Sequence, residues 1–264
     1  MSMAQKVWPE EGRIHMTSIR GTDASAVNSL TGKVALVSGG NRGIGRAIAR
    51  KLAALGASVA ICGRDVKSLE ATANEIAANG AAVQWRRADV RNPSDVQALV
   101  ANTESCLGAI DILVNNAGIG LFGPVHEASD QDWDNIFDTN LKSLFLLSRA
   151  AIPAMIRRKS GDIINISSLA GKNTFAGGGL YCASKWAVQG LSGCMAEDLR
   201  GYGIRVSTVC PGSVFTEFSG RGPKDPGKVL TPQDVAHAVA MIATQGPQSF
   251  LSEIQLRPLV KPQK

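Results

Sequence analysis

Tyr181 and Lys185 are the residues of this 264-residue chain whose types and spacing first suggest chemistry. They stand four positions apart in the run Tyr-Cys-Ala-Ser-Lys, so both side chains lie on one face if the segment is helical. A phenol has an ordinary pKa of about 10 and holds its proton too tightly for exchange at neutral pH. Because a nearby ammonium group favours the phenolate and lowers that pKa, the pair is a candidate proton donor. Two such residues on a solvated helix face are also common, and the surrounding sequence decides between the two interpretations.

A glycine-rich turn follows an apolar run early in the chain. The run Val-Ala-Leu-Val at 34–37 predicts a strand, Gly39, Gly43 and Gly45 follow it, and residues 46–52 have a helical pattern. A turn of this kind lets backbone amides and the positive end of a helix dipole bind a pyrophosphate. The spacing Gly-x-x-x-Gly-x-Gly differs from the standard dinucleotide fingerprint Gly-x-Gly-x-x-Gly, and an ordinary glycine-rich connection is the alternative.

Three further motifs each follow an apolar run that predicts a strand. They are Asn115-Asn116-Ala117-Gly118 after 110–114, Ser167-Ser168 after 163–166, and Pro211-Gly212 after 206–210. In open α/β sheets, ligands bind beyond the carboxyl ends of the strands. We therefore expect these motifs to gather at one edge of a sheet.

The alternation of short Val, Ile and Leu runs with helix-length amphipathic stretches predicts an α/β fold. Strands are expected near residues 34, 58, 82, 110, 161, 204 and 252. We expect a single-domain, Rossmann-type doubly wound sheet of about seven parallel strands with helices on both faces. The length of 264 residues and the apolar fraction of 44% suit one such domain with a substantial core.

The glycine turn, the Asn-Asn-Ala-Gly and Pro-Gly motifs, the serine pair and Tyr-x-x-x-Lys together resemble the short-chain dehydrogenase/reductase family, over roughly residues 31 to 260. The resemblance implies an enzyme that interconverts a carbonyl and a secondary alcohol by hydride transfer with a nicotinamide cofactor. It implies four catalytic residues, of which Ser168 is preferred to Ser167 because it lies 13 positions before the tyrosine. The four are Asn140, Ser168, Tyr181 and Lys185.

Each of the four has a role by the same resemblance. Tyr181 protonates the carbonyl oxygen, and Ser168 donates a hydrogen bond that stabilises the developing charge. Lys185 is expected to lower the pKa of Tyr181 and to hold the nicotinamide ribose. Asn140 is expected to anchor a water chain that resupplies the proton, and no metal is needed.

The end of the second predicted strand indicates which cofactor is used. Enzymes of this type that use NAD usually carry a carboxylate there, to bind the ribose hydroxyls, whereas this chain has Gly63. Arg64 follows it, and Arg42 lies inside the glycine turn. Two guanidinium groups can bind a 2'-phosphate with charge-assisted hydrogen bonds, so we expect NADP(H). The alternative is two solvated surface arginines.

The remaining cofactor-binding residues are also implied by the resemblance. Asp89 and Val90 would border the adenine, Asn115 would steady the central strand, and Val214 and Thr216 would contact the nicotinamide amide and phosphate. The full predicted set is Gly39, Asn41, Arg42, Gly43, Ile44, Gly45, Arg64, Asp89, Val90, Asn115, Ala117, Gly118, Tyr181, Lys185, Pro211, Gly212, Val214 and Thr216.

Composition argues against several other function classes. The charge of +6 comes from 28 Lys and Arg against 22 Asp and Glu, but the basic residues are dispersed. A nucleic-acid or membrane partner is therefore not expected. The five cysteines form no close pair and the three histidines are scattered, which predicts reduced thiols, no metal site and a cytoplasmic location.

Two regions outside the motifs carry further expectations. Residues 1–30 form an N-terminal extension that is either disordered or an arm against a partner subunit, and residues 31–264 form the catalytic domain. Residues 215–230 are rich in Gly and Pro and predict a short mobile lid. An open pocket of this kind favours a tolerant carbonyl or 3-hydroxy acid-type reductase, in which Phe122, Phe175, Phe215 and Phe218 are possible lining residues or plain core.

Two alternative functions stay open at this stage. One is a 3-oxoacyl-carrier-protein reductase, although such enzymes typically end with Thr-Gly and Val-Asp-Gly-Gly, and this chain ends Leu-Ser-Glu-Ile-Gln-Leu-Arg-Pro-Leu-Val at 251–260. The other is a non-catalytic NADP(H)-sensing protein. Family members commonly form dimers or tetramers through the helices that follow Asn140 and carry Tyr181, and Trp186, Leu191 and Met195 are candidate contacts or core residues.

Overall fold

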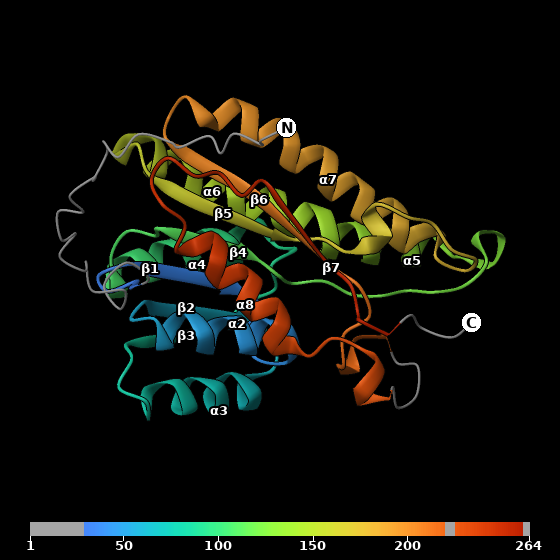
Figure 1. Cartoon of the computed structure of the whole chain (residues 1–264), viewed down its shortest axis with the longest axis horizontal. Coiled ribbons are helices and arrows are strands. Elements are labelled where there is room, and N and C mark those ends of the chain that lie inside the picture. Colours follow the sequence, from blue (N-terminus) through green and yellow to red (C-terminus); the bar gives the residue numbers. More distant parts are fainter. Residues whose placement is uncertain (1–28, 220–224, 261–264) are drawn as a thin grey trace, which may run out of the picture.

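The computed structural model describes residues 29–219 and 225–260. Of the expected N-terminal extension, Ser29 and Leu30 alone are described, and residues 220–224 of the expected lid also lie outside the described residues. Figure 1 shows the chain as layers of helix, sheet and helix. The predicted α/β fold class is therefore confirmed.

A seven-stranded, all-parallel sheet forms the centre of the molecule. Its strand order is β3-β2-β1-β4-β5-β6-β7. The seven predicted strand positions are confirmed. The strands are β1 (Val34–Ser38), β2 (Ser58–Gly63), β3 (Val83–Arg87), β4 (Ile112–Asn115), β5 (Gly161–Ile166), β6 (Ile204–Pro211) and β7 (Glu253–Leu256).

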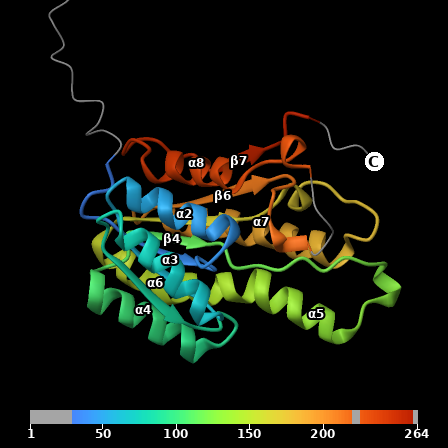
Figure 2. The ribbon, with the colours of Figure 1, turned by 90° about the horizontal axis from the view of Figure 1, so that it is seen from below.

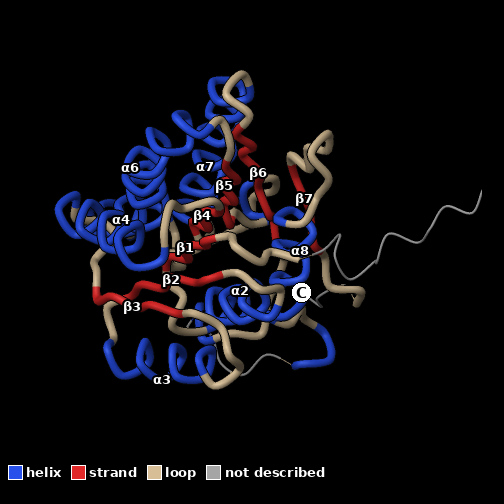
Figure 3. The backbone as a smooth tube through the Cα atoms, turned by 90° about the vertical axis from the view of Figure 1, so that its left-hand side faces the viewer, coloured by secondary structure: helices blue, strands red, loops and turns tan. Residues whose placement is uncertain are grey.

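Helices cover both faces of this sheet (Figure 2). On one face, α2 (Gly43–Ala54), α3 (Val66–Ala77) and α8 (Pro232–Ala243) bury one apolar cluster. On the other, α4 (Pro93–Leu107), α6 (Ser143–Arg158) and α7 (Gly179–Arg200) bury a second, and α5 (Asp130–Phe137) packs beside α7. Figure 3 shows the two groups of helices on opposite sides of the strands.

The strands form because their side chains are buried on both faces. All five residues of β1 are buried, as are four of the six in β2, which explains their continuous apolar runs. Side-chain caps fix where several helices begin. Ser129 and Asp132 form a capping box at α5, and Thr231 and Asp234 form another at α8.

The strand order reverses between β1 and β4, which lie side by side with their chain connections leaving in opposite directions. Such a switch point opens a crevice at the carboxyl ends of the strands. The glycine turn follows β1, and Asn116-Ala117-Gly118 follows β4. The sheet therefore brings these two predicted motifs to the same crevice.

Among residues 29–219 and 225–260, none of the helices is long and apolar enough to cross a membrane. In the same residues, His, Cys, Asp and Glu side chains form no group of three or more that could hold a metal ion.

Candidate active site

A cleft of about 1570 Å³ runs along the carboxyl edge of the sheet. One region of its lining is the glycine turn and the end of β2, and another includes Phe122, Phe175, Phe215 and Phe218. Tyr181 and Lys185 also line the cleft, and the Tyr181 ring lies against those of Phe122 and Phe218. The cleft thus joins a region suited to phosphates with a region suited to an apolar molecule.

The glycine turn has the geometry of an anion-binding site. Gly39 and Gly43 adopt φ angles of +64° and +52°, which favour glycine. A Cβ atom at Gly45 would collide with the carbonyl oxygen of Gly39, so the turn closes tightly against the start of α2. Arg42 is the N-cap residue of α2, its side chain forms no hydrogen bond with the helix's N-terminal amides, and the first turn of the helix contains no acidic residue. The free backbone N–H groups at the start of α2 and the positive end of its helix dipole can bind a phosphate.

Asn41 is held in place by two residues of α3. Its side-chain nitrogen Nδ2 donates to Ser68 Oγ at 2.8 Å, and its backbone carbonyl oxygen accepts a hydrogen bond from Thr72 Oγ1 at 3.1 Å. A Cβ atom at Gly63 would lie 2.6 Å from Asn41 Oδ1. Asn41 therefore fills the space that a carboxylate at the end of β2 needs.

Arg42 and Arg64 both line the cleft at the end of β2. The guanidinium of Arg42 forms an ion pair with Glu217 at 3.3 Å, and both side chains are largely exposed. Arg64 is close enough to Asp89 to help lower the pKa of that carboxyl, after the larger effect of the hydrogen bonds from Arg91. Both predicted arginines thus line the same cleft.

Tyr181 and Lys185 are both buried on one face of α7, as their spacing predicts. Lys185 Nζ donates to the backbone oxygen of Ile166 at 2.9 Å and lies 6.0 Å from the Tyr181 ring centroid. Burial lowers the pKa of Lys185 to about 8. Both side chains are therefore out of solvent at the centre of the cleft.

The expectation that Lys185 lowers the pKa of Tyr181 is wrong for the protein by itself. Burial raises the pKa of Tyr181 to about 12, and the hydrogen bond with Ser168 offsets only part of this rise. The phenol lies in an apolar cluster with Ile136, Ala170 and Cys182, where the charged form is poorly solvated. Burial is thus the largest effect on this pKa, and the Lys185 ammonium group is hydrogen-bonded to the backbone oxygen of Ile166 instead.

Ser168 follows β5 and lines the cleft, as expected from its place after a strand. Its hydroxyl accepts the backbone N–H of Ala170 at 3.1 Å and donates to the carbonyl of Pro211 at 3.4 Å. Ser167 also lines the cleft but is buried, and its hydroxyl donates to the backbone oxygen of Lys185 at 3.3 Å. This difference agrees with the choice of Ser168 as the functional serine.

Asn140 lies in a short π-helical segment, η2 (Asp138–Lys142), between α5 and α6. Its side-chain oxygen Oδ1 accepts the backbone N–H of Ile119, and its Nδ2 donates to the backbone oxygen of Ile119. Nδ2 also donates to Ser184 Oγ at 3.0 Å. A Cβ atom at Gly118 would lie 3.2 Å from Asn140 Oδ1 and 3.7 Å from Lys185 Nζ. Asn140 and Lys185 therefore approach the same point from two helices.

Asn115 is the one predicted cofactor residue that does not line the cleft. It is buried in the sheet, where its amide nitrogen donates to Ser148 Oγ at 3.1 Å and to Asn165 Oδ1 at 2.8 Å. Asn165 in turn donates to Ser192 Oγ at 2.8 Å. This buried network links α6, β4, β5 and α7, so the predicted contact with the cofactor is corrected to an internal one.

The other predicted cofactor residues all line the cleft. The carboxylate of Asp89 accepts three hydrogen bonds from the Arg91 guanidinium, between 2.6 and 3.1 Å, and this occupies much of its bonding capacity. The complete set that lines the cleft is Gly39, Asn41, Arg42, Gly43, Ile44, Gly45, Arg64, Asp89, Val90, Ala117, Gly118, Tyr181, Lys185, Pro211, Gly212, Val214 and Thr216.

Ser38 and Asn116 hold the crevice together and were not predicted. Ser38 Oγ accepts the N–H groups of Asn116 and Ala117, each at 3.0 Å. Asn116 Nδ2 donates back to the Ser38 carbonyl at 2.9 Å. The signal was a single polar residue at the end of an otherwise apolar strand, which fixes the two loops of the switch point to each other.

Comparison with known proteins adds to this geometry. The family model for short chain dehydrogenase matches residues 33–226. A 2-(S)-hydroxypropyl-CoM dehydrogenase of Xanthobacter autotrophicus is 37% identical, covering 81% of this chain and 91% of that protein. An uncharacterized oxidoreductase of Staphylococcus aureus is 34% identical, covering 87% and 99%.

Two solved structures are similar over most of the chain. A metagenomic short-chain oxidoreductase in complex with NADP is 45% identical, with a TM-score of 0.79, covering 88% of this chain and 99% of that one. A blue fluorescent protein from a metagenomic library, in complex with NADPH, is 34% identical, with a TM-score of 0.80, covering 87% and 98%. From the matched family model and these relatives, this chain belongs to the short-chain dehydrogenase/reductase family of oxidoreductases, which act on alcohol and carbonyl groups.

Proposed function

We propose that this protein is an NADPH-dependent reductase that converts a small carbonyl compound to a secondary alcohol, with Tyr181 as the acid. The observation that carries the proposal is the position of Tyr181, buried in the cleft between the phosphate-binding turn and an apolar end. The phenol is protonated at neutral pH, which is the form that donates to a carbonyl oxygen.

The four candidate catalytic residues have separate roles in this reaction. The nicotinamide supplies the hydride. Tyr181 gives its proton to the carbonyl oxygen, and Ser168 orients that oxygen and stabilises its growing charge. The Lys185 ammonium lowers the cost of the transient phenolate, and Asn140 holds the Ile119 backbone beside Lys185, where a proton path to solvent can start.

NADP(H) is favoured over NAD(H) by the residues around the end of β2. Arg42 and Arg64 offer two guanidinium groups for a 2'-phosphate, and Asn41 occupies the place of a ribose-binding carboxylate. If each arginine contributes about 1.5 kcal/mol, the preference for NADPH is on the order of a hundredfold. The NADP and NADPH carried by the two similar solved structures support the same choice.

The test is NADPH oxidation by the purified protein with an acetoacetyl thioester, a diketone, an aromatic aldehyde and a 3-keto acid, each repeated with NADH. We expect turnover of the small carbonyls with NADPH, and at least a hundredfold loss of kcat in Tyr181→Phe with NADPH binding unchanged. Turnover that survives in Tyr181→Phe would contradict the assigned acid. Tight NADPH binding without turnover of any substrate would favour a sensing protein, and turnover of the thioester alone would favour a carrier-protein reductase.

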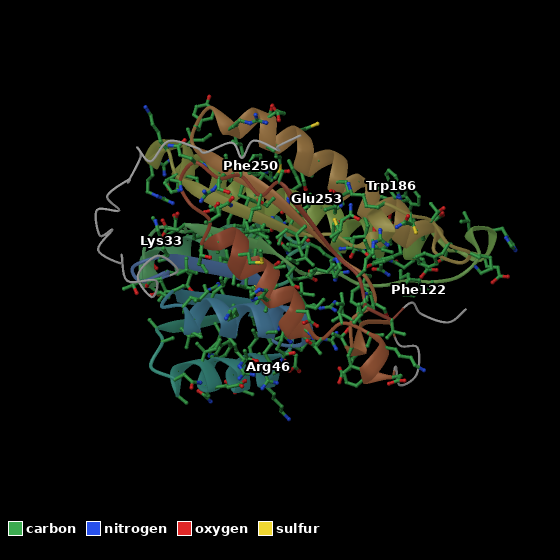
Figure 4. The ribbon with its side chains drawn as sticks, viewed as in Figure 1. Lys33, Arg46, Phe122, Trp186, Phe250 and Glu253 are labelled. Carbon is green, nitrogen blue, oxygen red and sulfur yellow. The ribbon has the colours of Figure 1, made fainter. Side chains whose placement is uncertain are left out.

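We also propose that the protein self-associates through the outer faces of α6 and α7. Phe145 on α6 and Trp186 on α7 expose 43% and 49% of their surface, which is unusual for aromatic side chains (Figure 4 labels Trp186). Met195, a candidate contact from the sequence, is instead buried in the core. Light scattering should give a multiple of the 27.7 kDa chain mass, reduced in Trp186→Glu; a monomeric parent would refute the proposal.

A further inference from the structure

The end of the cleft beyond Tyr181 is built from aromatic rings. The Phe122 ring centroid lies 5.3 Å from that of Tyr181, with the planes tilted by 59°, and the Phe218 centroid lies 5.8 Å from Tyr181 at 60°. Phe175 is 6.2 Å from Phe122. These are separations at which aromatic rings attract one another. The phenol that would donate the proton is thus itself one member of a ring cluster.

Glycines give the rings their positions. A Cβ atom at Gly120 would lie 2.7 Å from the Phe122 ring and 2.9 Å from the Phe218 ring. One at Gly178 would lie 2.6 Å from the Phe175 ring. The rings therefore rest directly on backbone, where any larger residue would displace them.

The two loops that carry Phe122 and Phe175 are joined by a hydrogen bond. The backbone N–H of Gly123 donates to the carbonyl of Gly177 at 2.9 Å, and Gly177 has a φ of +72° that favours glycine. This bond fixes one ring loop against the other. The aromatic end of the cleft is therefore organised before a substrate enters, which reduces the entropy lost on binding.

The described residues at this end of the cleft include no charged side chain other than Lys185. Ile119, Leu169, Ala170 and Asn173 complete the lining around the rings. Glu217, the residue before Phe218, also lines the cleft, and its carboxylate is paired with Arg42 of the glycine turn. A substrate carboxylate or phosphate bound here would find no described cation beyond the catalytic lysine, and its desolvation would cost free energy.

From the ring cluster and the neutral lining, we propose that the natural substrate is an uncharged aryl ketone, with its aromatic group held between Phe122 and Phe218. This inference rests on the proposed carbonyl reduction and narrows its substrate class. The carbonyl oxygen would accept hydrogen bonds from Tyr181 and Ser168. The aryl group would pack on the faces and edges of the Phe rings, and a saturated ring of the same size would form weaker contacts there. Reduction adds the hydride to carbon and the Tyr181 proton to oxygen, which gives a benzylic alcohol.

The test compares acetophenone with cyclohexyl methyl ketone, which match in size but differ in aromaticity. We expect kcat/KM with NADPH to favour acetophenone by about threefold to tenfold. The variants Phe122→Leu and Phe218→Leu should each remove most of that preference. Phe250→Leu is the control, because Phe250 lies at the opposite end of the sheet, beside Arg200, and does not line the cleft (Figure 4). Equal values for the two ketones in the parent protein would overturn the proposal.

A binding measurement separates this proposal from the proposed reaction. Ligand-observed NMR on the Tyr181→Phe variant loaded with NADPH gives the affinity for both ketones and for 4-acetylbenzoate without turnover. Tighter binding of acetophenone than of either competitor would support the aryl substrate even if the parent enzyme reduced neither ketone. Tighter binding of the anionic 4-acetylbenzoate, or equal binding of both ketones, would overturn it even if reduction were observed.

Discussion

Asn41 and Gly63 are so close that residue 63 has no room for a side chain. A Cβ atom there would lie 2.6 Å from Asn41 Oδ1, and Asn41 is held by Ser68 and Thr72 of α3. The packing of Asn41 against Gly63 therefore bears on cofactor choice, in addition to Arg42 and Arg64. The absence of a carboxylate at the end of β2 follows from the packing of the glycine turn.

This contact predicts the result of an attempt to change the cofactor. Gly63→Asp by itself should weaken NADPH and NADH alike, by at least tenfold, because the new side chain displaces Asn41 and the turn. In Asn41→Ala/Gly63→Asp the clash is removed, and NADH binding should recover while NADPH binding does not. Fluorescence titration of both cofactors measures this, with Asn41→Ala as the control. Full NADH binding by the single Gly63→Asp variant would contradict the packing argument.

The ion pair between Arg42 and Glu217 predicts that a carboxylate weakens NADPH binding. Glu217→Gln should lower the Kd for NADPH by about twofold to fivefold at low salt, because Arg42 is released for the 2'-phosphate and a like charge is removed. The Kd for NADH should not change, and added salt should reduce the gain. Glu197→Gln is a matched control, since Glu197 pairs with Arg200 on the exposed surface of α7. An equal gain for NADH would show that the 2'-phosphate is not involved.

Several parts of the fold and site could be predicted from the sequence because they depend on local patterns. Apolar runs mark strands that are buried on both faces, and their number and parallel order were confirmed. The spacing of Tyr181 and Lys185 predicted that both side chains lie on one face of a helix, which was also confirmed. Contacts between distant loops, such as that of Asn41 with Gly63, leave no such pattern, since each partner is an ordinary polar or small residue.

The misplaced role of Asn115 has the same origin. An asparagine directly after an apolar run can point into the cleft or into the sheet, and the sequence does not distinguish the two. The pKa of Tyr181 was predicted in the wrong direction because the sequence supplied its charged neighbour but not the extent of its burial. Burial depends on Ile136 and Ala170, which come from elements far apart in the chain.

Asn115 provides a third prediction, on stability. Asn115→Ala removes the donor to Ser148 and Asn165 and leaves the buried Asn165 amide oxygen unpaired. The free energy of unfolding should fall by about 2 kcal/mol, as for other buried hydrogen bonds that lose one partner. The Kd of the folded variant for NADPH should stay within about twofold of the parent, because Asn115 does not line the cleft. Denaturation in urea and cofactor titration test the two parts, and a large rise in Kd with normal stability would restore the direct cofactor contact.

Lys185 provides a last prediction, on how stability depends on pH. Its pKa is lowered by burial to about 8, whereas in the unfolded chain it has its ordinary value of 10.5. Between these values the unfolded state binds more protons than the folded state, so stability rises with pH, and below pH 8 this contribution is lost. From pH 8 to 9 the free energy of unfolding should therefore rise by about 1 kcal/mol from this residue.

Lys185→Met isolates this effect. Cys62 and Tyr181 have pKa values raised by burial to about 12, so their contributions fall as pH rises and act in the opposite direction, mainly above pH 9. The parent protein and the variant share them, so the difference between their urea unfolding curves at pH 8 and pH 9 reports Lys185. We expect the parent to gain stability relative to the variant over this interval. Parallel changes in the two proteins would mean that the pKa of Lys185 is not lowered in the folded state, and that its ammonium group is not desolvated beside Tyr181.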